Sequence, residues 1–187
     1  MDLPSSFRLF VVRRNAAVLL AAGAIAAALF TGYLVVQNRL ARERFQALQV
    51  SDPPRYLDDL RRLRGFDAFL AAYRQAQGFG AFRLDAPRFL IGRWTMRTER
   101  VRLPPSGSFG LCENPLLIEY GHIVFQIDRQ RSSAAEFRLT KEGVLEVRTA
   151  DYGVIPIRIV AYGAQIDHLL LTPPGGEQAV YAYPCTA

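Results

Sequence analysis

The side chains that could carry out acid–base chemistry are few and far apart in the chain. There are two histidines, His122 and His168, and imidazole is the side chain that most readily exchanges protons near neutral pH. His122 follows Gly121 in a predicted hairpin turn, where a polar surface residue is expected without any catalytic role. His168 shares a strand phase with Ile166 and Leu170, so we predict that it points inward.

An inward histidine next to an aspartate is a combination that can tune an imidazole pKa. However, Asp167 and His168 are adjacent on a predicted strand, and adjacent strand residues point to opposite faces. We therefore expect a satisfied core or rim histidine rather than a general base. Ser106 and Ser108 lie in a Pro/Gly loop without a recognisable partner, and the sequence has no Gly-x-Ser-x-Gly elbow, phosphate loop or histidine cluster. The sequence predicts no catalytic residue, no cofactor and no enzyme activity.

The two cysteines, Cys112 and Cys185, are widely separated and lack the spacing of a metal site. In an oxidising compartment they would form a disulfide closing a loop of about 74 residues, worth about 4 kcal/mol in the loop-entropy model. In a reducing compartment they would be two small apolar residues. We favour the disulfide, because both cysteines lie near predicted strand ends.

The element that organises the chain is an uncharged run from Asn15 to Asn38. As a helix it would be roughly 36 Å long, enough to cross a hydrocarbon core of about 30 Å. We predict a transmembrane helix at 15–38, a tail at 1–14 and a linker or helix extension at 39–53. A cleaved signal peptide is the alternative, but the apolar run is longer than usual and no clean A-x-A site follows it before Arg39.

The arginines on both sides of this run do not decide its orientation. A 14-residue leader and the cysteine pair favour a cytoplasmic N-terminus and a periplasmic C-terminal domain. Abundant Ala, Gly and Arg with a single lysine are typical of a GC-rich bacterium, so we expect a single-pass protein of a bacterial inner membrane. Small residues four apart could form a helix-packing face, although an alanine-rich run produces such spacing by chance: Ala22, Gly23, Ala26 and Ala27.

Residues 54–87 are predicted to form an amphipathic helix and a connection. Apolar residues recur there at intervals of three and four up to about Gln77, Gly78 is a natural C-cap, and Gly65 marks a candidate break. This helix needs an apolar surface to lie on.

Residues 88–187 change to a period of two and are predicted to form eight strands joined by short turns. This pattern predicts an antiparallel meander that closes into a barrel, so the fold class is mainly β with an N-terminal α part. Pro156 has no N–H to donate, so its strand is expected to be bulged there or at an edge. The expected strands are 89–101, 116–121, 123–129, 134–140, 144–149, 154–162, 165–172 and 178–184.

The first of these strands contains Gly92-Arg93-Trp94. A Gly-x-Trp motif on the first strand of an eight-stranded meander resembles the lipocalin and wider calycin families. The resemblance implies that Trp94 packs across the closed end of the barrel. It also implies a barrel that holds a small apolar ligand, or one that acts as an interaction module or inhibitor.

The connection from Leu103 to Pro115 is the most distinctive loop. Pro104, Pro105 and Phe109 make it a candidate interaction surface. The alternative is a structural connection held in place by Cys112.

The formal charge is +6, but the arginines are interspersed with acids, so we expect a solvated face and no nucleic-acid partner. We predict a membrane-anchored, non-enzymatic interaction protein whose partners are the bilayer and other envelope proteins. The alternatives are a carrier of a small apolar ligand or lipid and a calycin-type protease inhibitor. Bulky positions predicted to face inward favour the interaction protein, because they would fill an eight-stranded barrel: Ile91, Phe125, Phe137, Val147, Ile157 and Leu170.

Overall fold

The computed structural model of the chain describes residues 5–104, 107–126 and 130–185. It divides into two compact units, Met1–Asp52 and Pro53–Ala187. The first unit is the single helix α1 (Ser5–Ser51), which continues past the apolar run as the sequence predicts. From Val18 onward α1 is long and apolar enough to cross a membrane, and a signal sequence near an N-terminus would have the same properties.

The second unit begins with two short helices, α2 (Pro53–Arg64) and α3 (Phe66–Ala76). The break expected at Gly65 is present: its φ of 86° is readily adopted by glycine, and it redirects the chain. The Phe66 N–H then donates to the carbonyl of Gly163, at 2.8 Å. The Arg61 Nε–H donates to the carbonyl of Ala164 at 2.5 Å. Both helices are therefore tied to the same turn of the barrel.

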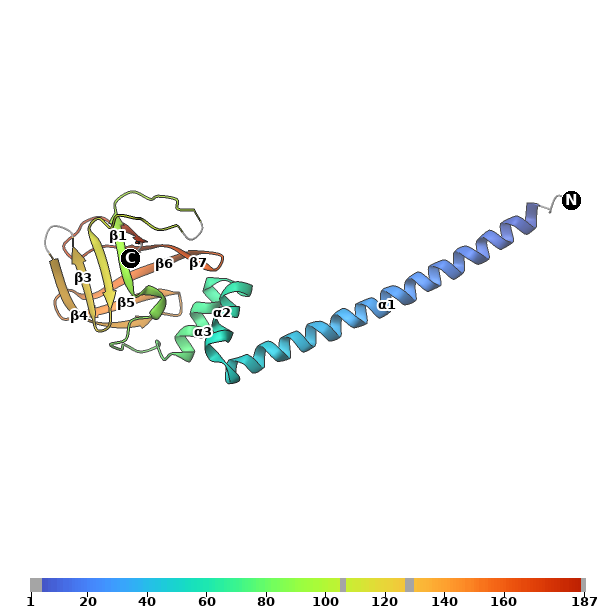
Figure 1. The fold of residues 1–187 in the computed structure, drawn as a ribbon, viewed down its shortest axis with the longest axis horizontal. Coiled ribbons are helices and arrows are strands. Elements are labelled where there is room, and N and C mark those ends of the chain that lie inside the picture. The colour runs from blue at the N-terminus through green and yellow to red at the C-terminus, as the bar shows by residue number, and fades with distance from the viewer. Residues whose placement is uncertain (1–4, 105–106, 127–129, 186–187) are drawn as a thin grey trace. The chain divides into compact units, whose positions relative to one another are not determined.

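The rest of the unit is an eight-stranded antiparallel barrel (Figure 1). Each strand pairs with the next, and β1 pairs with β8 to close the wall. The predicted fold class is thereby confirmed. A 3-10 turn at Arg88–Leu90 precedes a first strand that is shorter than expected. The strands are β1 (Gly92–Arg97), β2 (Pro115–Glu119), β3 (His122–Gln126), β4 (Gln130–Leu139), β5 (Val144–Thr149), β6 (Gly153–Tyr162), β7 (Gln165–Leu171) and β8 (Val180–Pro184).

The barrel interior is the hydrophobic core. Large apolar side chains of β2 to β7 point into it and are 0–1 % exposed: Leu116, Ile118, Ile123, Phe125, Phe137, Leu139, Leu145, Val147, Ile157 and Leu169. Two positions predicted to face inward do not. Ile91 precedes β1 and is half exposed, and Leu170 is outside the core because it alternates with Leu169 and Leu171.

One end of the barrel is covered by the helices. Phe66, Phe69 and Tyr73 of α3 join the core cluster, and their rings pack against Phe89 with centroids 5.0–5.5 Å apart. This is the apolar surface that the amphipathic pattern requires. The turns between β4 and β5 and between β6 and β7 lie at this same end, because antiparallel strands reverse direction in order.

Two irregularities shape the wall on the β6–β7 side. Pro156 pairs with β5, whereas the described β6–β7 pairs start only at Arg158. Pro156 therefore lies where β6 has a single neighbouring strand, and its lack of an N–H costs no hydrogen bond to β7. The second irregularity is a bulge: Val160 faces His168 and Ala161 faces Ile166, which leaves Asp167 without a partner residue.

Candidate functional site

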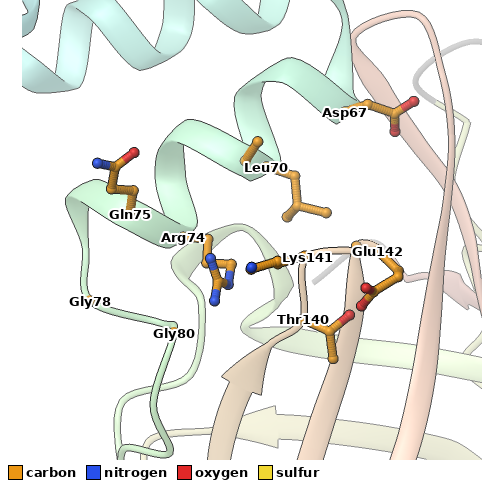
Figure 2. Close-up of a pocket in the computed structure, with 11 residues that line it drawn as sticks. Asp67, Leu70, Arg74, Gln75, Gly78, Gly80, Thr140, Lys141 and Glu142 are labelled. Carbon is orange, nitrogen blue, oxygen red and sulfur yellow. The ribbon is translucent and has the colours of Figure 1, made fainter.

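A groove on the barrel unit lies between α3 and the turn that joins β4 to β5 (Figure 2). Its volume is about 720 Å³. One wall is the face of α3 that carries Leu70 and Arg74. The other wall is the loop between β4 and β5, residues 140–143. The lining residues are Asp67, Leu70, Ala71, Arg74, Gln75, Gly78, Gly80, Thr140, Lys141, Glu142 and Gly143. We call this site the α3 groove.

The two walls of the α3 groove are held together by close packing and by one hydrogen bond. A Cβ placed on Gly143 would lie 3.1 Å from Leu70 Cδ2, so the turn approaches the helix as closely as a glycine allows. The Arg74 Nε–H donates to the carbonyl of Leu139, at 2.7 Å. This bond fixes the half-buried arginine across the gap between helix and strand.

Four charged residues line the groove, two of each sign, but they are not arranged in pairs. Figure 2 shows the Lys141 side chain extending toward the Arg74 guanidinium, whereas Glu142 lies beside Thr140 and Asp67 lies nearer the start of α3. The pKa of Glu142 is lowered, first by a hydrogen bond from its own backbone N–H and then by one from the Thr140 hydroxyl. The charges of Lys141 and Arg74 lower this pKa further. The Glu142 carboxylate is therefore already engaged within its own turn.

This arrangement is suited to recognition rather than to proton transfer. The two cations extend toward each other beside the apolar Leu70. Gly80 lies against the Arg74 guanidinium, because a Cβ added to this glycine would be 3.2 Å from Arg74 Nη2. The sequence predicts the Lys141-Glu142-Gly143 turn but not the groove. Residues 67–80 and 140–143 meet only in the folded barrel, and no sequence pattern connects them.

The structure places His168 differently from the sequence prediction. The ring does not point into the barrel, because the bulge at Asp167 reverses the strand phase: Ile166 packs against the core, and His168 lies on the outer side of the wall. The same bulge brings the two neighbours together, with His168 Nδ1 2.6 Å from Asp167 Oδ2. The expectation that Asp167 cannot orient this ring is therefore wrong.

His168 is nevertheless only 3 % exposed. The connection from β1 to β2 lies near this part of the wall, because its residues Arg102 and Leu103 line a small hollow together with Asp167. We call this connection, residues 98–114, the strap. The ring contacts Tyr181 and Tyr183, with centroids 5.3 and 5.7 Å away. The Tyr183 hydroxyl accepts a hydrogen bond from the Val101 N–H of the strap, at 2.6 Å. Burial raises the pKa of Tyr183.

The predicted disulfide is confirmed. Cys112 Sγ and Cys185 Sγ are bonded, and the bond ties the strap to the end of β8. Of the predicted interaction residues, Phe109 packs on the wall against Tyr183, with centroids 5.6 Å apart, and lies beneath the Arg97 guanidinium. Pro104 is exposed, and Pro105 lies outside the described residues. A docking role for the strap stays a prediction.

Gly92 and Trp94 lie where β1 begins, at the covered end of the barrel. Trp94 is buried in the core cluster, and its indole Nε1–H donates to the carbonyl of Leu90 at 3.0 Å. Gly92 has a φ of 141°, a conformation that favours glycine. The resemblance to a calycin-like barrel is consistent with this closed wall of eight strands, and family membership stays a prediction.

The remaining predicted positions lie at the surface. His122 is exposed at the start of β3. Ala22, Gly23, Ala26 and Ala27 are exposed on α1, and no described atom would contact a Cβ added at Gly23. Their helix-packing role stays a prediction. Within the described ranges, no three His, Cys, Asp or Glu side chains gather as metal ligands would.

The fold and the groove thus define a helix-capped, disulfide-bonded, eight-stranded antiparallel β-barrel that carries a mixed-charge groove. The chain matches no protein-family model, no curated protein and no solved structure.

Proposed function

We propose that this protein is a membrane-anchored, non-enzymatic interaction protein, an accessory or assembly subunit of a bacterial inner-membrane complex. In this proposal α1 is the membrane anchor and the barrel unit is periplasmic. The disulfide supports an oxidising compartment, because such bonds rarely persist in a reducing cytosol.

The observation that carries the proposal is the filled interior of the barrel. An eight-stranded barrel has room for its own side chains or for one small ligand. Here rings and branched chains from opposite walls meet in a single cluster, for example Phe125, Phe137 and Ile157. α3 adds further rings at the covered end. The barrel interior is therefore filled by the side chains of the core, and a partner would bind to the outer surface.

The experiment that tests this proposal is gentle detergent extraction of the tagged full-length chain from its own membranes. The purified material is analysed for proteins and lipids together by mass spectrometry. An unrelated tagged single-pass protein from the same membranes is the matched control. We expect a fixed set of membrane subunits that the control does not carry. A lone chain with one stoichiometric small molecule would overturn the proposal and favour a ligand carrier.

A further inference from the structure

We propose that the α3 groove binds an acidic side chain of a partner polypeptide, with its carboxylate seated between Arg74 and Lys141. This inference rests on the proposed function and names the chemistry of the partner. It is separable from that function, because an interaction protein could bind through another surface.

The first step of the argument is that neither cation forms an ion pair in the described parts of the chain, although the charge of Glu142 acts on both. Lys141 makes no hydrogen bond or ion pair with any residue in the described parts of the chain, and Arg74 uses only its Nε–H, on Leu139. Yet the two side chains extend toward each other in one hollow (Figure 2). Like charges so placed repel, and an anion between them relieves the repulsion and gains charge-assisted hydrogen bonds.

The second step is that the site is preorganised. The Arg74 stem is fixed by its bond to Leu139 and cannot swing away without breaking it. The Lys141 backbone belongs to a tight turn in which the Thr140 N–H donates to the Val144 carbonyl at 2.8 Å. Arg74 and the Lys141 backbone are thus held in place before binding, and this lowers the entropic cost. Only the exposed Lys141 side chain remains to be ordered.

The third step selects the occupant. Asp67 and Glu142 at the rim repel a multiply charged anion such as phosphate but tolerate a single carboxylate, and they would attract a basic residue next to it. The apolar Leu70 and the elongated lining along α3 and the β4–β5 turn suit a polypeptide, which can place an apolar side chain beside its acidic one. An extended segment with an acidic residue therefore fits better than a lipid headgroup.

The test uses the fact that Lys141 is the only lysine of the chain. A water-soluble carbodiimide couples a lysine amine to a carboxylate in contact with it. An amide forms, and the water removed converts the carbodiimide to a urea. Native membranes that contain the full-length protein are treated with this reagent, and adducts are mapped by mass spectrometry. Lys141→Arg is the matched control, because it keeps the charge but offers no amine to couple.

We expect an amide between Lys141 and an Asp or Glu of another polypeptide, absent from the Lys141→Arg protein. The coupled segment is then synthesised and its Kd measured with the detergent-solubilised full chain. Lys141→Gln should weaken binding roughly two- to fivefold, the range for losing an exposed ion pair. The same loss is expected when the acid of the segment becomes its amide. Arg158→Gln, an exposed change on β6 outside the groove, should leave the Kd unchanged.

The inference is overturned if Lys141 is coupled to no other polypeptide, or only to its own chain or to phosphatidylserine. It is equally overturned if Lys141→Gln binds the segment as tightly as the unchanged protein. Should the detergent extraction still yield a fixed set of subunits in those cases, the proposed function stands and only the groove assignment fails.

Discussion

Replacing both cysteines by alanine should lower the stability of the barrel unit without changing its fold. The bond joins residues 73 positions apart, and a loop of that length is worth about 4.4 kcal/mol in the loop-entropy model at 25 °C. The folded strap keeps other contacts, such as the Phe109 N–H to the Pro184 carbonyl at 3.0 Å. We therefore expect the loss to arise mainly in the unfolded chain.

Trp94 makes the measurement direct, since it is the only tryptophan and is 5 % exposed in the core. Its fluorescence follows urea unfolding of the full-length protein in detergent. With a typical slope of about 2 kcal/mol per molar urea, the Cys112→Ala/Cys185→Ala protein should unfold about 2 M earlier. The unchanged protein, fully reduced, serves as the control and should unfold at the same urea concentration as the double variant.

A shift below about 0.5 M would refute this reasoning, because it would mean that the bond constrains the unfolded chain by less than about 1 kcal/mol. A changed slope would point instead to altered compactness of one of the two states.

Three further predictions concern packing and titration. Gly143→Ala and Gly153→Ala share a positive φ, but only Gly143 faces an atom within 4 Å, so Gly143→Ala should cost about 1 kcal/mol more in urea unfolding; equal losses would contradict the close approach of turn and helix. Burial raises the pKa of Tyr183 in the folded protein. The neutral hydroxyl therefore makes its full contribution to the free energy of unfolding below the pKa of the unfolded chain, about 10, and this contribution is lost as the pH rises through the pKa of the folded protein. The fall in stability above about pH 10 should therefore be smaller in Tyr183→Phe. Trp94→Phe should cost about 2 kcal/mol, measured by circular dichroism, because it leaves the Leu90 carbonyl without its indole donor.

The sequence predicts the barrel well because its information is local. Period-two patterns and glycine turns specify strands and hairpins one pair at a time, and β5 matches its predicted range of 144–149. The first strand is shorter than predicted because the chain at Arg88–Leu90 forms a 3-10 turn. The Leu90 carbonyl of this turn accepts a hydrogen bond from the Trp94 indole. Such a bond produces no periodic pattern of apolar residues, so the sequence gives no sign of it.

The orientation of His168 could not be predicted, because a bulge is a property of two paired strands. The alternation of inward and outward side chains on β7 shifts by one residue at Asp167, because β6 has no residue opposite it. The sequence of one strand does not reveal how it aligns with its neighbour. The α3 groove escaped prediction for a related reason. Its two walls come from segments about 65 residues apart, as the bond from Arg74 to Leu139 illustrates.

The disulfide also has a mechanical consequence. It closes a covalent ring that contains β2 to β8 and leaves α1, α2, α3 and β1 outside. A load applied between the two chain ends enters at Cys112 and leaves at Cys185, so it crosses the sulfur–sulfur bond and bypasses the ring. Only the segments before Cys112 can lengthen under such a load, at up to about 3.5 Å per residue. The load would pull β1 from its ladders with β2 and β8, whereas the backbone from β2 to β8 could not be extended while the sulfur–sulfur bond holds.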